Sequence, residues 1–293
     1  MQHFTATTTS QALFELGLDF ESKKGQVFDH MFQPISGKST IYRADTDKVL
    51  GIHSSRYEHM AYSEAFEVFD RLLGDGQCQV VSGANIDEGA RAFLQIKMPE
   101  TAEVLRGDSM DLYLNGFASH DGSFSLAYSY GANRLACSNQ VMGTFRQGRK
   151  QVRSVSIRHS KNMRDKMELA EKVLWEGAKC LEVLRENAQI LARKAITSKE
   201  AKQFADSLFP FAEGAKKDRN KANREKVIEL VDSGMGTDIE GVRGSAWGLY
   251  NAGTEWYDHH SPTRGKGLGR DERSVVEGAK FRDRAFELAM AIS

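Results

Sequence analysis

The sequence predicts an α+β protein with a β-hairpin-rich N-terminal half, a long helix packed on the sheet and a helical C-terminal half. Two observations predict it. Up to residue 157, short segments alternate polar and apolar residues, and after residue 160 apolar residues recur every three or four positions. Strand-like and helix-like segments do not alternate along the chain, which excludes a doubly wound β-α-β fold.

We expect three regions within the 293 residues, because the residue pattern changes character twice. They are an N-terminal arm at residues 1–35, a β-rich core with a long helix at residues 36–195, and a helical C-terminal region at residues 196–293. A chain of this length can bury a substantial apolar core.

The predicted arm is interrupted by Gly17, Gly25 and Pro34. Between Phe14 and Phe20 its apolar residues alternate with others. A short apolar arm ahead of the main fold suits exchange between subunits. We therefore expect this segment to pack on a neighbouring subunit.

Alternation predicts the strands of the first half. They are residues 39–43, 49–53, 77–82, 90–97, 111–118, 123–130 and 152–157. Asp121-Gly122 makes the clearest hairpin, because it supplies the positive φ that a tight turn needs. Residues 63–73 are predicted as a helix with Ser63 as its N-cap.

The second half is predicted as helices. Residues 160–195 form one pattern that would be roughly 50 Å long as a continuous helix. Thr197-Ser198-Lys199-Glu200 is a capping box, so a second helix should start there and end at Pro210. Further helices are expected at residues 216–232, 243–259 and 271–292.

The net charge of zero conceals an uneven distribution. Residues 1–140 carry 11 basic and 18 acidic side chains, a net of −7, which leaves 29 basic and 22 acidic side chains, a net of +7, for residues 141–293. The densest basic stretch consists of Arg146, Arg149, Lys150, Arg153, Arg158, Lys161, Arg164 and Lys166. It predicts contacts with nucleic-acid phosphates, and the alternative is a solvated face that balances the acidic half.

Two segments of the second half are further candidates for nucleic-acid contact. Trp247 and Tyr250 share one helix face, which suits core packing or base stacking. A Gly-rich segment before the last helix is either a flexible linker or a phosphate contact at a helix N-terminus. Its basic residues are Arg264, Lys266 and Arg270.

The motifs that suggest catalysis are weak. Ser119-His120-Asp121-Gly122 holds catalytic residue types in a row, but neighbours on one turn do not converge as a triad does. The adjacent His259 and His260 point away from each other on a helix, which disfavours a shared metal ion. We expect no metal and no cofactor, and a non-catalytic role is favoured although an enzyme is not excluded.

Composition also indicates a compartment. The three cysteines are few and widely spaced, as in reduced intracellular proteins. No stretch of about 18 apolar residues is present, and the N-terminus lacks the features of a secretion signal. We therefore expect a cytoplasmic protein with no membrane partner.

Three segments carry a resemblance to a known family. They are residues 42–57, the hairpin 114–124 with its continuation 134–141, and residues 245–259. From about residue 27 to the C-terminus the chain resembles a family of phage- and plasmid-encoded proteins described as a domain of unknown function. The resemblance implies mobile-element DNA biology in a bacterial host and assigns no catalytic residues.

The order of elements is similar to a second group at the level of fold alone. Hairpins, a basic strand and a long helix follow one another in the core of phage and eukaryotic single-strand annealing proteins. Those proteins hold single-stranded DNA in a basic groove and assemble into rings or filaments. The comparison implies the same kind of partner and a homo-oligomer here.

Three functions are consistent with these observations. The first is oligomeric single-stranded DNA binding or annealing, as in DNA recombination, without catalysis. The second is an anti-defence protein whose acidic half binds a host protein. The third is a metal-dependent DNA nuclease, which needs a carboxylate cluster from Asp108, Asp111 or Asp121.

Overall fold

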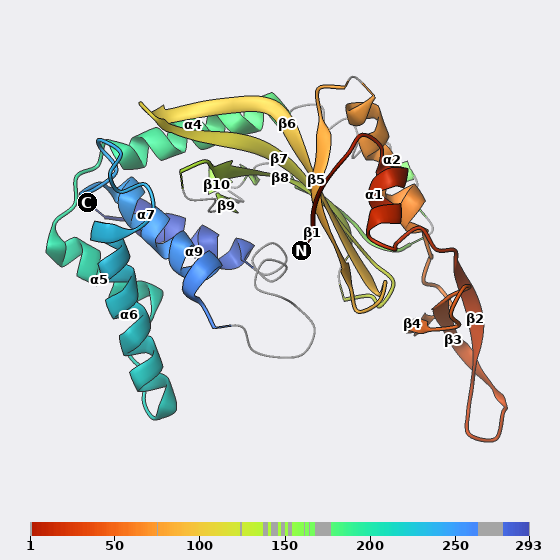
Figure 1. Ribbon diagram of the computed structural model, residues 1–293. Helices are drawn as coiled ribbons and strands as arrows, with labels where there is room; N and C mark the ends of the chain where they lie inside the picture. The colour runs from red at the N-terminus through yellow and green to blue at the C-terminus, as the bar shows by residue number, and fades with distance from the viewer. Residues whose placement is uncertain are drawn as a thin grey trace. The chain divides into compact units, whose positions relative to one another are not determined.

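The computed structural model confirms the α+β fold, with a β-rich first half and helices in the second (Figure 1). It describes residues 2–74, 76–123, 125–136, 140–141, 146–147, 150–151, 154–160, 162–163, 165–167, 177–262 and 278–292. In that part of the chain, no helix combines the length and apolarity that crossing a bilayer requires.

The chain forms two compact units whose boundaries fall inside strands. Unit 1 comprises Met1–Pro99, Tyr113–Tyr130 and Arg153–Glu176, and unit 2 comprises Glu100–Leu112, Gly131–Val152 and Gly177–Ser293. Residues 1–35 therefore lie in the same unit as the predicted strands that follow them.

The main sheet has the strand order β1-β5-β6-β7-β8-β12, and β9 pairs with β8. The strands are β1 (Gln2–Ala6), β5 (Gln79–Ile86), β6 (Arg91–Leu105), β7 (Asp108–Ser119), β8 (Leu126–Arg134), β9 (Gln140–Val141) and β12 (Ser154–Ile157). The described registers are antiparallel, as a hairpin-rich sequence predicts. The predicted hairpin turn is confirmed at Gly122, where φ is +73°.

Helix α1 (Thr9–Glu15) buries Ala12 and Leu13 in unit 1, and helix α2 (Tyr62–Leu73) buries an apolar face that includes Phe66 and Phe69. The carboxylate of Asp70 accepts hydrogen bonds from the backbone and the hydroxyl of Thr9, at 2.9 and 2.6 Å, which ties the two helices together. Glycine is required at position 116, because a Cβ there would lie 2.6 Å from the ring of Phe69.

Two predictions for unit 1 are wrong. The N-cap of α2 is Ala61, which makes no side-chain capping bond, so Ser63 lies inside the first turn. The segment around Leu16 and Leu18 does not await another subunit, because both side chains are buried within their own chain. Of the residues expected to face a neighbour, Phe14 is the exposed one.

A small three-stranded sheet forms a separate element of unit 1. It consists of β2 (Ser22–Phe28), β3 (Pro34–Arg43) and β4 (Val49–Ser54), in that order. Its core contains Ile41 and Leu50, packed with Ala90 and with the rings of Phe20 and Tyr57. These contacts anchor the base of the sheet.

Unit 2 contains most of the helices. They are α4 (Gly177–Ala192), α5 (Ser198–Leu208), α6 (Ala215–Ser233), α7 (Ala246–Glu255), the π-helical turn η1 (Trp256–His260) and α9 (Ala279–Met290). The capping box is confirmed, since Thr197 and Glu200 make both reciprocal bonds at the start of α5. The short strands β10 (Arg146–Gln147) and β11 (Lys150–Gln151) pair with each other.

The predicted long helix is confirmed in part. Its second half is α4, and residues 163 and 165–167 are helical near its start. Residues 168–176, between the two, lie outside the described residues.

Candidate nucleic-acid interface

The structure describes two side chains of the predicted basic stretch. Arg158 is exposed directly after β12, and Lys166 is exposed in the helical residues that follow. The backbones of Arg146 and Lys150 belong to β10 and β11. Four residues of the stretch lie outside the described residues, namely Arg149, Arg153, Lys161 and Arg164.

Next to Arg158, three half-buried rings form a row centred on Tyr57. The ring of Tyr57 stacks on His53 at 3.9 Å between centroids, with 11° between the planes. It also stacks on His159 at 4.6 Å and 24°. Since His53 lies on β4 and His159 follows β12, the row joins segments that are about 100 residues apart in the sequence. We call these three residues the ring row.

Backbone carbonyl groups hold the ring row in place. His53 Nε2 lies 2.6 Å from the carbonyl oxygen of His120, which can only accept, so this nitrogen donates. The hydroxyl of Tyr57 donates to the carbonyl of Ser119 at 3.1 Å. His159 Nδ1 lies 3.2 Å from the carbonyl of Glu58 and donates in the same way. The rings are therefore oriented by the β7–β8 hairpin and by the loop after β4.

Lysine and arginine side chains flank the ring row. Lys24 on β2 donates its ammonium to the carbonyl groups of Ser55 and Tyr57, at 3.1 and 3.0 Å. Arg56, between these two residues, is exposed, as is Arg158 beside His159. Planar rings and exposed cations in one place match the stacking and phosphate contacts that single-stranded nucleic acid uses.

Beneath the ring row lies a second group of rings, which is buried around His120. The ring of His120 lies 4.2 Å from Tyr62 and 5.4 Å from His59 between centroids. Tyr62 donates to the carbonyl of Gly89 at 2.8 Å, and Ser22 Oγ lies 2.6 Å from His59 Nε2. This group supports the ring row from inside unit 1.

Burial favours the neutral form of His59, His120 and His159. Burial lowers the pKa of His120 to about 3, with the neighbouring His59 and His159 as smaller causes. Burial is also the main reason that the pKa values of His59 and His159 lie below the usual value for histidine. Arg56, Arg158 and Lys24 place positive charge around the ring row.

The Ser119-His120-Asp121-Gly122 turn is not arranged as a triad. Asp121 pairs with Arg91 at 2.8 Å and accepts a hydrogen bond from the backbone of Ser123. It therefore stabilises the turn and the neighbouring strand. The backbone carbonyls of Ser119 and His120 accept the hydrogen bonds that orient Tyr57 and His53.

Trp247 and Tyr250 cannot serve as a stacking surface, and the core-packing alternative is correct. Both are fully buried in unit 2, and their rings stack on each other at 5.6 Å. The indole nitrogen of Trp247 donates to Asp108 at 2.8 Å. The other candidates of the second half lie outside the described residues, namely Arg264, Lys266 and Arg270.

The carboxylates that a nuclease would need are engaged separately. Asp108 is buried with Arg134 at 2.6 Å and with Trp247, and Asp111 accepts a hydrogen bond from Thr101 at 2.8 Å. Asp121 belongs to the β7–β8 turn in unit 1. Among the residues that the structure describes, no three His, Cys, Asp or Glu side chains are grouped so that they could hold a metal ion.

Sequence reasoning missed the ring row. The signals were present as Arg56-Tyr57 after a strand and as Arg158-His159 after another, each a cation next to a ring. Neither dipeptide is informative alone, because only the fold brings the two together.

The fold and the site together define a class of protein. It is an α+β protein with an antiparallel sheet and a ring row flanked by cations. The chain belongs to the family described as a domain of unknown function (DUF932), whose model matches residues 49–277. The matched range includes the whole ring row and His120. Neither a curated protein nor a solved structure matches the chain.

Proposed function

We propose that this protein binds and anneals single-stranded DNA as a homo-oligomer, without catalysis, in the DNA metabolism of a phage or plasmid in the bacterial cytoplasm. The observation that carries the proposal is the ring row of His53, Tyr57 and His159 beside the exposed Arg158. The basic stretch continues from there along the chain to Lys166.

Each part of this surface has its own role in DNA binding. Bases stack on the accessible parts of the rings, which contributes about 1–3 kcal/mol per base and tolerates any sequence. Arg158, Arg56 and Lys166 neutralise phosphates, which makes binding dependent on salt. Rings held by backbone carbonyls are oriented before DNA arrives, so less conformational entropy is lost on binding.

The test is a pair of charge reversals with a matched control. Arg158→Glu with Lys166→Glu removes two exposed cations of the proposed surface. Lys216→Glu with Lys217→Glu makes the same change in net charge on the exposed side of α6 in unit 2. Because both pairs are exposed, neither variant should lose its fold.

Binding is measured by fluorescence anisotropy with a labelled single strand of about 40 nucleotides, at several salt concentrations. We expect the first pair to lower affinity about tenfold or more, and to reduce the slope of log affinity against log salt by about 1.4. The control pair should bind nearly as the wild type does. Equal losses in the two variants, or no binding by the wild type, would contradict the proposal.

A further inference from the structure

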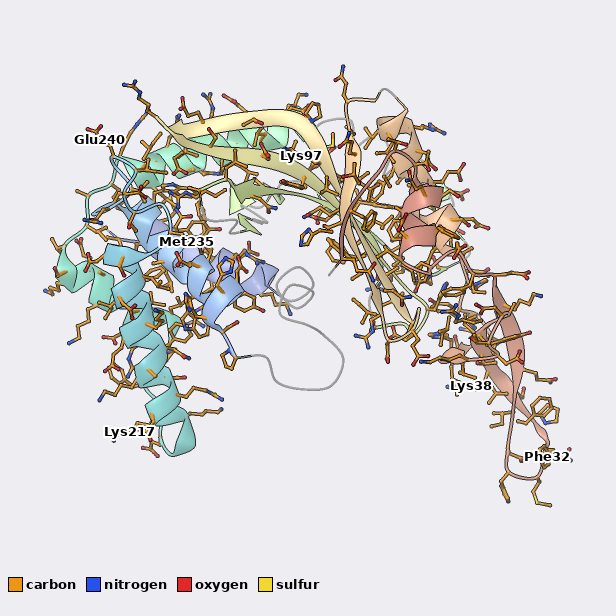
Figure 2. The ribbon with its side chains drawn as sticks, in the orientation of Figure 1. Phe32, Lys38, Lys97, Lys217, Met235 and Glu240 are labelled. Atoms are coloured by element: carbon orange, nitrogen blue, oxygen red, sulfur yellow. The ribbon has the colours of Figure 1, made fainter. Side chains whose placement is uncertain are left out.

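The β2–β3 hairpin of unit 1 extends beyond the strand that supports it. β3 pairs with β4 from Lys38 to Tyr42, whereas β2 and β3 stay paired as far as Phe28 and Pro34. The remainder is a two-stranded ribbon, with Phe32 at its tip and Lys38 nearer its base (Figure 2).

The tip of this ribbon is apolar and exposed. Phe32 is 86% exposed, Met31 is 65% exposed and Phe28 is 51% exposed. Ile35 on β3 completes the group at 40%. Scattered single apolar residues are normal on a surface, but four within eight positions at one tip indicate a binding surface.

The turn holds this tip in one shape. Asp29 Oδ1 accepts hydrogen bonds from the backbone of Met31 and of Gln33, both at 2.9 Å. Phe32 donates its backbone N–H to the carbonyl of Asp29 at 3.1 Å. The φ of Phe32 is +57°, a left-handed conformation that bulky side chains rarely adopt. The aromatic ring is therefore displayed at a conformational cost, as at many binding sites.

The lysines of the ribbon lie nearer its base than its tip, and they favour an anionic partner along the ribbon (Figure 2). Between residues 22 and 42 the chain carries Lys23, Lys24 and Lys38 against Asp29, a net of +2. Lys23 pairs with Glu21 at 3.1 Å, so Lys24 and Lys38 are the cations that this argument uses. The whole of residues 1–140 has a net of −7, so this ribbon is a basic segment within an acidic half. Asp29 also uses its carboxylate within the turn, as described above.

The ribbon is joined to the ring row at its base. Lys24 on β2 bonds the backbone of Ser55 and Tyr57, and β4 carries His53. A DNA strand that stacks on the ring row would therefore lie at the base of a basic ribbon with an aromatic tip. Apolar side chains on such projections unstack neighbouring bases when they insert between them.

From this juxtaposition we infer that the Phe28–Ile35 tip is a wedge that inserts Phe32 and Met31 between stacked bases of nucleic acid. The inference rests on the proposed function and adds base unstacking to it. Unstacked bases are free to pair with a complementary strand, which connects the wedge to annealing.

The experiment uses the full chain and a single strand that contains 2-aminopurine, whose fluorescence rises when it is unstacked. Phe32→Asn removes the ring and suits the left-handed backbone, because asparagine tolerates that conformation. Phe14→Gln is the matched control, since it removes another exposed phenylalanine of unit 1. Anisotropy and light scattering are recorded on the same samples.

We expect the wild type and Phe14→Gln to raise the fluorescence on binding. Phe32→Asn should bind the strand with affinity reduced by about tenfold at most, and should lose most of the rise at saturation. An unchanged rise in Phe32→Asn overturns the wedge while the proposed function stands. A lower oligomer mass of Phe32→Asn without DNA, together with an unchanged rise, assigns the tip to a second copy of this chain and also overturns it.

Failure of the proposed function itself gives a different result. In that case the wild type shows no anisotropy change with the strand at low salt, and the wedge is refuted with it.

Discussion

His120 lies at the tip of the β7–β8 hairpin and is 1% exposed. Its backbone carbonyl orients His53, while its ring packs against Tyr62. Burial lowers its pKa to about 3, whereas an unfolded histidine titrates near its ordinary value of 6.5. Between these two values the unfolded chain binds more protons than the folded chain, so stability rises with pH across this range.

This residue predicts a loss of stability in mild acid. From about pH 7.5 to pH 5, His120 should cost the wild type about 2 kcal/mol of unfolding free energy. His120→Phe keeps a ring of similar size and cannot be protonated, so it should show a smaller difference between the two pH values. Urea unfolding followed by circular dichroism measures the difference.

The control for His120 is His3→Gln, which removes an exposed histidine of β1. It should keep the wild-type dependence on pH. If His120→Phe keeps that dependence as well, the cluster around His59 and His159 must carry it, and the assignment to His120 is wrong.

At the scale of elements, short local signals determine where segments begin. The hydroxyl and backbone of Thr197 and the carboxylate of Glu200 close the first turn of α5 through reciprocal bonds. Helix α5 then buries Phe204, Ala205 and Leu208 in the core of unit 2. The cap is exposed, but the face that it starts is buried.

Loss of this cap should therefore lower the stability of unit 2 by a measurable amount. Thr197→Ala should lower the free energy of unfolding by about 1 kcal/mol. Ser198→Ala, an exposed hydroxyl at the next position, is the control and should change it by less than about 0.5 kcal/mol. Urea midpoints of the two variants give the comparison, and equal midpoints would refute the role of the box.

For the whole molecule, the proposal predicts assembly. Light scattering of the purified protein should give a multiple of the chain mass of 32.7 kDa. At low salt the assembly should take up a single strand and release it as salt rises, because phosphate contacts are screened. A monomer that does not bind DNA at low salt would contradict the proposal and favour a host protein as the partner.

Shortening the chain is a poor test of this assembly. Residues 1–25 include Leu13, Leu16 and Leu18, which are buried in unit 1. Their removal would damage the core of the subunit, so a lower mass could not be assigned to a lost contact between subunits. Point changes of exposed residues are the appropriate variants.

Patterns within single segments were enough to predict many elements. Alternation predicted β3, β4, β7 and β8, and the capping box predicted the start of α5. These features depend on residues a few positions apart, because the periods of strands and helices are local properties of the backbone. The fold class was accessible from the sequence for the same reason, whereas the domain of unknown function was recognised by the resemblance of longer segments.

Only the tertiary structure decided which side chains form surfaces and which form cores. Trp247 and Tyr250 had the right chemistry for stacking but are buried, and Asp108, which accepts the hydrogen bond of Trp247, is 139 residues away from it in the sequence. Tyr57 and His159 were not informative individually, yet they stack on each other in unit 1. Burial and stacking depend on contacts between distant segments, and these contacts cannot be predicted from the local residue pattern.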